Sequence, residues 1–239
     1  MKKFLLLILA LFIIACKNEP ETNNEKNFRK ISSFKINVDE PSDLALSFEG
    51  DAFWTVSDDN STIYKLSFEG EILHKIKIKY GDLEGVTVLD KNKLAIAVEE
   101  ERLICIINLE GKLLKEFRLH LKGEFNKGIE GLVFNPDNQH FYLVNEKYPA
   151  MLIELDKNFD VVLEKEINFV SDLSAITYNK KTGQLWLLSD ESKKVAVCDL
   201  KGNLIRKIGF DIVQAEGICL KDDNIFIVSD PKAEIYKLK

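Results

Sequence analysis

The chain has 239 residues, of which 46% are hydrophobic and 30% charged, a balance that indicates an ordered globular protein and excludes a disordered polymer. Its 39 acidic side chains outnumber 33 lysines and arginines, and the formal net charge of −6 argues against nucleic-acid binding and favours cations or basic partners. Cys105, Cys198 and Cys219 lie in apolar segments without CxxC spacing. We therefore expect these cysteines in the core, and neither a disulfide framework nor a zinc site.

The N-terminus has the features of a secretory leader. Residues 1–3 are Met-Lys-Lys, and residues 4–15 form an unbroken apolar run that is too short to span a bilayer but has the size of a signal-peptide core. The run ends in Ile13-Ile14-Ala15-Cys16, which resembles a bacterial lipobox. This resemblance implies that residues 1–15 are removed and that Cys16 carries a diacylglycerol and palmitate. An ordinary cleaved signal peptide is the alternative.

The residues after the leader predict a tether followed by one folded domain. Residue 17 is Lys and not Asp. By resemblance to lipoprotein sorting signals, this implies a cell-envelope protein anchored in the outer membrane, on its periplasmic or surface face. Residues 16–28 are polar, so we expect them to form a flexible tether. Residues 29–239 are then long enough for a single all-β domain, which we expect to be monomeric.

One pattern recurs five times in this domain. Each copy begins with a small residue followed by an apolar one, and the small residue stands at positions 45, 85, 131, 175 and 217. Further along each copy, an apolar run is closed by an acid; these acids are Asp58, Glu99, Glu146, Asp190 and Asp230. The intervals of 40, 46, 44 and 42 residues between copies are typical of a β-propeller with one blade per copy.

Each copy predicts four antiparallel strands separated by turn-forming residues, but the fifth copy stops at Lys239 after its third strand. Residues 30–38 (KISSFKINV) have the alternating pattern of the missing outer strand. An N-terminal strand that completes the last blade would close the ring and remove two exposed sheet edges. The sequence therefore predicts an all-β, five-bladed propeller with four-stranded antiparallel blades, closed by an N-terminal outer strand.

Acidic residues are expected to gather at one end of this ring. In an antiparallel pair the start of the first strand lies beside the end of the second. Three copies open their first strand with a glutamate, and these are Glu84, Glu130 and Glu216. Carboxylates that face one axis repel each other unless a cation neutralises them, and calcium takes six to eight oxygen ligands. Leu44 and Ser174 replace the glutamate in the other copies, so the blade does not require it. We favour metal ligation for these three.

The five acids that close the second strands have two interpretations. They could accept hydrogen bonds from backbone amides of the following loop, which is a common architectural role for such residues. They could also support the metal ligands or contact a ligand. We favour the architectural role because the position is acidic in every copy. Asp43, Asp82 and Asp172 lie just upstream of the first strands, and we expect them in loops of the same face.

The combination of these motifs resembles the SdiA-regulated protein family, distant relatives of the NHL-repeat propellers. The resemblance rests on the Pro41-Ser42-Asp43-Leu44-Ala45 opening, the repeated Glu-Gly-aliphatic starts and the Ser-Asp strand ends. It implies a membrane-associated five-bladed propeller with bound calcium and no established activity. It also implies Glu84, Glu130 and Glu216 as the ligands.

The function that we predict is a membrane-anchored module that binds calcium at the channel mouth and an unidentified small molecule or protein. The alternative is a calcium-dependent hydrolase, either a lactonase or a phytase-like phosphoesterase, in which the ion would act as a Lewis acid. We assign no catalytic residue, because the sequence has no nucleophile motif and its three histidines fall on outer strands or turns. Whether the protein is an enzyme stays open, with binding favoured.

Overall fold

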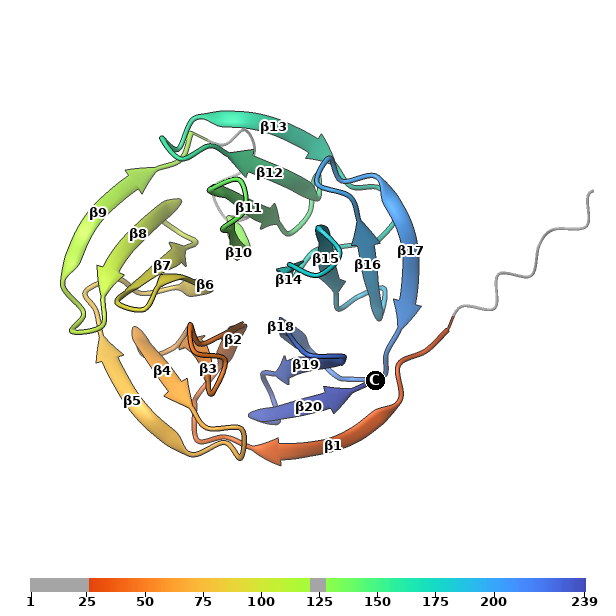
Figure 1. The fold of residues 1–239 in the computed structure, drawn as a ribbon, viewed down its shortest axis with the longest axis horizontal. Helices are drawn as coiled ribbons and strands as arrows, with labels where there is room; N and C mark the ends of the chain where they lie inside the picture. The colour runs from red at the N-terminus through yellow and green to blue at the C-terminus, as the bar shows by residue number, and fades with distance from the viewer. Residues whose placement is uncertain (1–25, 121–127) are drawn as a thin grey trace, which may run out of the picture.

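The computed structural model describes residues 26–120 and 128–239, so the leader, Cys16 and the tether up to residue 25 lie outside the described residues. The described chain is all-β, and its strands form five four-stranded antiparallel sheets around one axis (Figure 1). This arrangement is the five-bladed propeller that the repeat predicts. Within the described residues there is no helix long and apolar enough to cross a membrane.

The blades follow one another in chain order, and each has its first strand innermost. The first blade contains β2 (Pro41–Leu46), β3 (Phe53–Ser57), β4 (Thr62–Leu66) and β5 (Ile72–Lys77). The second contains β6 (Leu83–Asp90), β7 (Lys93–Val98), β8 (Leu103–Asn108) and β9 (Leu113–Arg118). The third contains β10 (Ile129–Asn135), β11 (His140–Asn145), β12 (Met151–Leu155) and β13 (Val161–Glu166). The fourth contains β14 (Ala175–Asn179), β15 (Gln184–Ser189), β16 (Lys194–Cys198) and β17 (Leu204–Gly209).

The fifth blade joins the two ends of the chain. It contains β18 (Ala215–Lys221), β19 (Asn224–Ser229) and β20 (Glu234–Leu238), and its outer strand is β1 (Lys30–Lys35). β1 pairs antiparallel with β20, with Ser33 opposite Tyr236 (Figure 1). The predicted closure by an N-terminal strand is therefore confirmed.

The chain just before β1 also contacts the ring. The backbone N–H of Phe28 donates to the Gly209 carbonyl at 2.9 Å, and its ring stacks on Trp186 with centroids 6.3 Å apart. Because Gly209 and Trp186 belong to the fourth blade, the N-terminal segment spans the joint between the fourth and fifth blades. Lys26 adds to these contacts, because its carbonyl accepts the Gly209 N–H at 3.1 Å.

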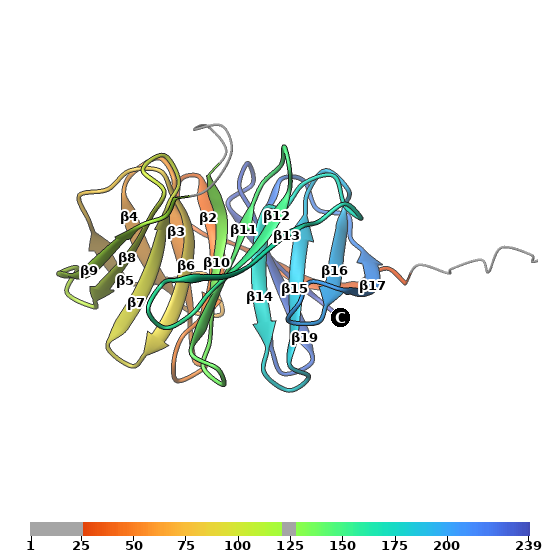
Figure 2. The same cartoon turned by 90° about the horizontal axis from the view of Figure 1, so that it is seen from above.

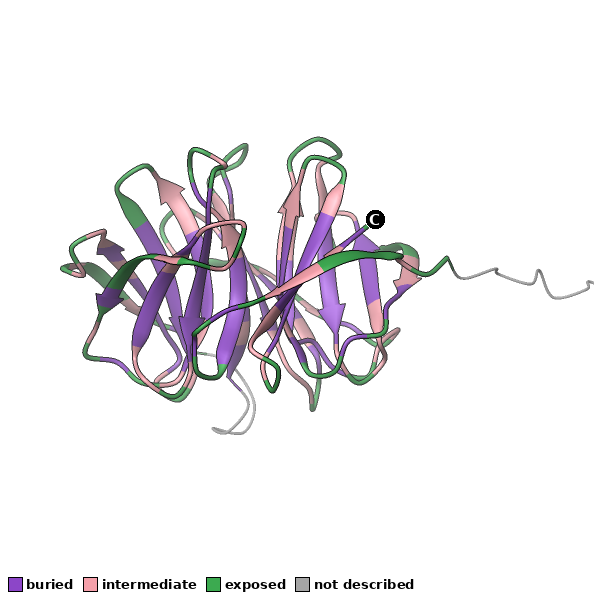
Figure 3. Cartoon of the chain, turned by 90° about the horizontal axis from the view of Figure 1, so that it is seen from below, coloured by how far each residue is buried: buried purple, intermediate pink, exposed green. Residues whose placement is uncertain are grey.

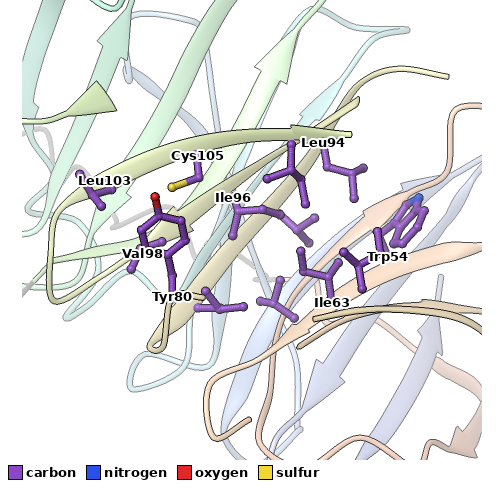
Figure 4. Packing of buried hydrophobic residues seen from close by; sticks show 13 residues of the cluster. Trp54, Ile63, Tyr80, Leu94, Ile96, Val98, Leu103 and Cys105 are labelled. Atoms are coloured by element: carbon purple, nitrogen blue, oxygen red, sulfur yellow. The ribbon is translucent and has the colours of Figure 1, made fainter. Parts of the chain in front are cut away.

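The hydrophobic core lies between neighbouring blades. Side chains of β3, β4, β7 and β8 pack together between the first and second blades, where Trp54, Ile63, Ile96 and Cys105 are buried (Figure 4). Burial is concentrated in the inner and middle strands, and the outer strands are largely exposed (Figure 3). The three cysteines of the described chain are free and buried, as predicted.

The inner strands crowd around the axis. Seen from the side, β10 and β14 run along the axis whereas β13 runs around the circumference (Figure 2). A Cβ added to Gly217 of β18 would lie 2.4 Å from the carbonyl carbon of Asp43 in β2, and one added to Gly131 of β10 would lie 3.0 Å from the Cα of Ala175 in β14. Neighbouring backbones therefore approach too closely for any larger residue at these positions.

We expect the substitution Gly217→Ala to lower the free energy of unfolding by about 3 kcal/mol, because the new methyl group meets backbone that cannot move without opening the ring. Urea denaturation measures this loss. The matched control is Gly81→Ala, whose nearest contact would be the Ser61 hydroxyl at 3.9 Å. Equal stability of the two variants would contradict the crowding.

Candidate metal centre

The glutamates that open the inner strands stand at β-bulges. Leu83 of β6 pairs with Val98 and Gly85 pairs with Ala97, so Glu84 is an extra residue without a partner in β7. The same one-residue shift occurs at Glu130 in β10 and at Glu216 in β18. A bulge re-aims the side chain of its extra residue. In the fourth blade β14 pairs with β15 without such a shift, and Ser174 precedes the strand.

These bulges direct carboxylates into a hollow at one end of the channel, which we call the acidic well. Its volume is about 460 Å³. It is lined by Glu40, Ser42, Asp58, Glu84, Glu99, Glu130, Glu146, Glu216 and Asp230. The well thus brings together the three inner glutamates and four of the five strand-end acids, whereas Asp190 is not part of its lining. Of the described residues, no lysine, arginine or histidine lines it.

Three carboxylates lie close enough to share one cation. Oxygen atoms of Asp58, Asp82 and Glu84 lie within 4.8 Å of one another. Asp58 follows β3 of the first blade, and the other two come from the start of the second blade, so the group bridges two blades. A hydrogen bond holds the Asp82 side chain in position, because one of its carboxylate oxygens accepts the backbone N–H of Glu100 at 2.7 Å. Glu130 and Glu216 lie in the same well but outside this group.

Burial and mutual repulsion raise the pKa of the acids in the well. Burial, followed by the charge of Asp58, holds the pKa of Glu84 well above its usual value. Burial and the neighbouring Asp82 raise the pKa of Asp58 to about 6. Burial and the charges of Asp190 and Asp230 raise that of Glu216 to about 7. The well therefore holds more charge than the folded chain accommodates without bound protons or a cation.

Two further acids of the well interact with each other. Burial is the main cause that raises the pKa of both Glu99 and Glu130, and their carboxyl groups are near neighbours. Glu99 also accepts the backbone N–H of Gly128 at 2.8 Å, which ties the second blade to the third.

The remaining strand-end acids have different partners. Asp190 accepts the backbone N–H of Ala215 at 2.7 Å and lies 2.6 Å from Lys193 Nζ, so it ties the fourth blade to the fifth. Glu146 lies 2.6 Å from Lys147 Nζ at the edge of the well. Burial raises the pKa of Asp230, which lines the well. The repeat-wide acid therefore does not have one uniform role.

Asp43 is buried in the innermost strand of the first blade. Only 1% of its surface is exposed, and its carboxylate accepts the backbone N–H groups of Leu44 at 2.7 Å and Val86 at 2.9 Å. The expectation of a loop position is wrong, because Asp43 lies inside β2, at a bulge where Asp43 and Leu44 together lie opposite Thr55, and its φ is 51°. Burial raises its pKa to about 7 in spite of these hydrogen bonds.

Sequence reasoning also left Asp82 out of the ligand set. The sequence does contain an acid two residues before Glu84-Gly85. Neither of the other two blades with a Glu-Gly pair has an acid at that position. Only the positions of β3 and β6 in neighbouring blades bring Asp82 beside Asp58.

Comparisons with known proteins agree with this architecture. A family model described as SdiA-regulated matches residues 22–239. The glutaminyl cyclase of Myxococcus xanthus superposes with a TM-score of 0.70 at 15% identity, covering 90% of this chain and 96% of that one. A chain of a nidogen/laminin complex gives 0.59 at 12% identity, covering 79% and 72%. Virginiamycin B lyase from Staphylococcus aureus gives 0.55 at 18% identity, covering 83% and 66%. At these identities the likeness shows the propeller fold alone.

The substitution Asp190→Asn is expected to lower the free energy of unfolding by about 1–2 kcal/mol. It removes the negative charge that faces Lys193, and it weakens the hydrogen bond from the backbone N–H of Ala215. Chemical denaturation tests this, with Asp211→Asn as control because Asp211 is exposed. An unchanged midpoint in Asp190→Asn would show that the contact between the blades contributes nothing.

The metal-free protein is expected to lose stability as the pH rises from about 5 to 8. Asp58, Asp43 and Glu216 have raised pKa values of about 6, 7 and 7, so the folded chain holds protons that the unfolded chain has already released. This stabilisation is complete below the usual pKa of a carboxyl group and is lost as the pH passes through the raised values. Thermal unfolding in EDTA measures it, and Glu216→Gln should flatten the profile. A midpoint that rises over this range would contradict the electrostatics of the well.

Proposed function

The chain belongs to the SdiA-regulated family, and from its acidic well we propose that this propeller binds a divalent cation, preferentially calcium, at one end of its channel. We further propose that it acts as a binding module for a small molecule or a protein. Its anchor would be the lipid on Cys16 in the outer membrane of the cell envelope. The lipobox-like sequence supports the anchor, although Cys16 lies outside the described residues.

The observation that carries the metal proposal is the grouping of Asp58, Asp82 and Glu84. Calcium–oxygen distances are about 2.3–2.6 Å, so two ligands on opposite sides of the ion lie roughly 4.6–5.2 Å apart. The oxygens of the three carboxylates lie within 4.8 Å of one another. They therefore need no large movement to contact one ion between them.

The donor set favours a hard cation. All three side chains offer oxygen, and the described residues that line the well present carboxylates and the Ser42 hydroxyl without a thiol or imidazole. Magnesium requires a nearly regular octahedron, whereas calcium accepts irregular oxygen cages of higher coordination number. Carboxylates that two separate blades contribute suit the more tolerant ion.

A bound cation would also stabilise the ring. It would neutralise the repulsion that raises the pKa values of Asp58 and Glu84, and it would join the first blade to the second. The rest of the acidic well would stay open beside the ion, with Glu130, Glu146 and Glu216 along its walls. A ligand or partner could therefore reach the ion with an oxygen atom and these carboxylates with amino groups. This open space supports the role as a binding module.

Thermal unfolding of the purified protein, first in EDTA and then with added calcium, tests the metal site. A ligand that binds only the native state at 100 times its Kd stabilises that state by about 2.7 kcal/mol, which in a chain of this size raises Tm by roughly 5–10 °C. We expect this rise in the wild type and its loss in Glu84→Gln. The matched control is Glu100→Gln, an exposed acid of the same end that does not line the well.

Two outcomes would reject the metal site: no calcium-dependent rise in the wild type, or an equal rise in Glu84→Gln and Glu100→Gln. Magnesium in place of calcium tests the choice of ion, and a larger rise with magnesium would reject the preference for calcium. Isothermal titration calorimetry on the same variants measures the affinity directly.

A further inference from the structure

The opposite mouth of the channel contains a second hollow, which we call the apolar cavity. Its volume is about 320 Å³, and all five inner strands contribute to its lining. Its walls combine polar groups with aliphatic and aromatic side chains, among them Leu46, Val88, Leu132, Phe134 and Ile176. A volume in this range is sufficient for a small organic ligand.

The apolar cavity does not communicate with the acidic well. Ser42 lines the well and Leu44 lines the cavity, and between them in the chain stands Asp43, with its carboxylate hydrogen-bonded to the backbone of β2 and β6. The two hollows share no lining residue. A ligand in the apolar cavity would therefore not touch a cation in the well, and the two sites can be tested separately.

Two hydroxyl groups in the walls of the apolar cavity, those of Thr87 and Tyr178, have hydrogen-bond partners within the protein. The Thr87 hydroxyl oxygen accepts the backbone N–H of Phe134 at 3.0 Å, and the Tyr178 hydroxyl donates to Asp137 at 2.8 Å. An apolar group of a ligand that packs against the aliphatic and aromatic side chains would gain by leaving water.

Two lysines place positive charge at one side of the rim of the apolar cavity. The turn between β14 and β15 places the exposed Lys180 and Lys181 in the lining. Lys181 lies 3.7 Å from the exposed Asp223, and Lys180 has no ion pair within the described part of the chain. One carboxylate, Asp222, also lines the cavity, but it lies 3.7 Å from Lys221. The rim can therefore accept a single anionic group.

We propose that the apolar cavity binds a small amphipathic molecule with an aliphatic or aromatic body and one anionic group, such as a carboxylate. The body enters between the inner strands, and the anion contacts Lys180 and Lys181 at the rim. This site is additional to the cation site and lies at the other end of the channel.

Fluorescence titration with anilinonaphthalene sulfonate, an aromatic probe with one anionic group, tests the proposal. The probe binds the full-length protein, and octanoate displaces it, whereas octyltrimethylammonium, of the same chain length but opposite charge, does not. Reversal of both rim charges in Lys180→Glu/Lys181→Glu weakens the binding about tenfold. The matched control is Lys201→Glu, an exposed lysine of the same blade outside the lining, which leaves the binding unchanged.

A second variant tests the apolar walls. Thr177→Trp places a large ring in the cavity and abolishes binding of the probe, and an unfolding transition like that of the wild type shows that the ring has remained folded. Binding that is equal in the wild type, the double lysine variant and Thr177→Trp overturns the site. Equal displacement by octanoate and octyltrimethylammonium overturns the anionic preference.

Calcium separates this proposal from the cation site. The affinity for the probe is the same in EDTA and in calcium, and Glu84→Gln leaves it unchanged, because the two hollows share no lining residue. Loss of probe binding in EDTA would overturn the independence of the two sites. A failure of calcium to stabilise the protein would reject the cation site and leave the probe titration to decide the apolar cavity.

Discussion

The approach of five inner strands to one narrow axis is the constraint on which the rest of this structure depends. Gly217 and Gly131 lie against the backbone of the neighbouring blades, where no larger residue fits. A ring of only five blades has little space at its centre, and the backbone polar groups there need partners. Asp43 provides two of them by accepting the N–H groups of Leu44 and Val86. The cost is a buried carboxyl group with a raised pKa.

The same convergence gives the channel two chemically different ends. Every inner strand starts at one end, where bulges turn Glu84, Glu130 and Glu216 into a shared hollow. At the other end the inner strands present aliphatic and aromatic side chains, and the turn after β14 adds two lysines. The two hollows share no lining residue. A single short repeat thus gives the channel one acidic end and one with many apolar side chains.

The repeat alone predicted the number of blades, their strand order and the closure by β1. These features depend on the hydrophobic alternation and on the repeat interval, and both can be read from the sequence. It also predicted that the glutamates and all five strand-end acids would face one end, since antiparallel pairing determines which strand ends are neighbours. The acidic well includes four of these five and leaves out Asp190. The partners of individual acids were not accessible in this way. Asp190 is hydrogen-bonded to the backbone of the next blade, whereas Asp58 occupies the same repeat position and faces Asp82.

What the sequence determined by itself was therefore the periodic part of the molecule: the blades, their pairing and the end at which the acids gather. The tertiary structure decided the parts that depart from the period. The bulge that buries Asp43 within β2 is one, and the meeting of Asp58 with Asp82 and Glu84 across two blades is another. Bulges and contacts between blades depend on where backbones approach each other in space. A pattern of residue types records each strand's alternation but not the distance between strands of different blades.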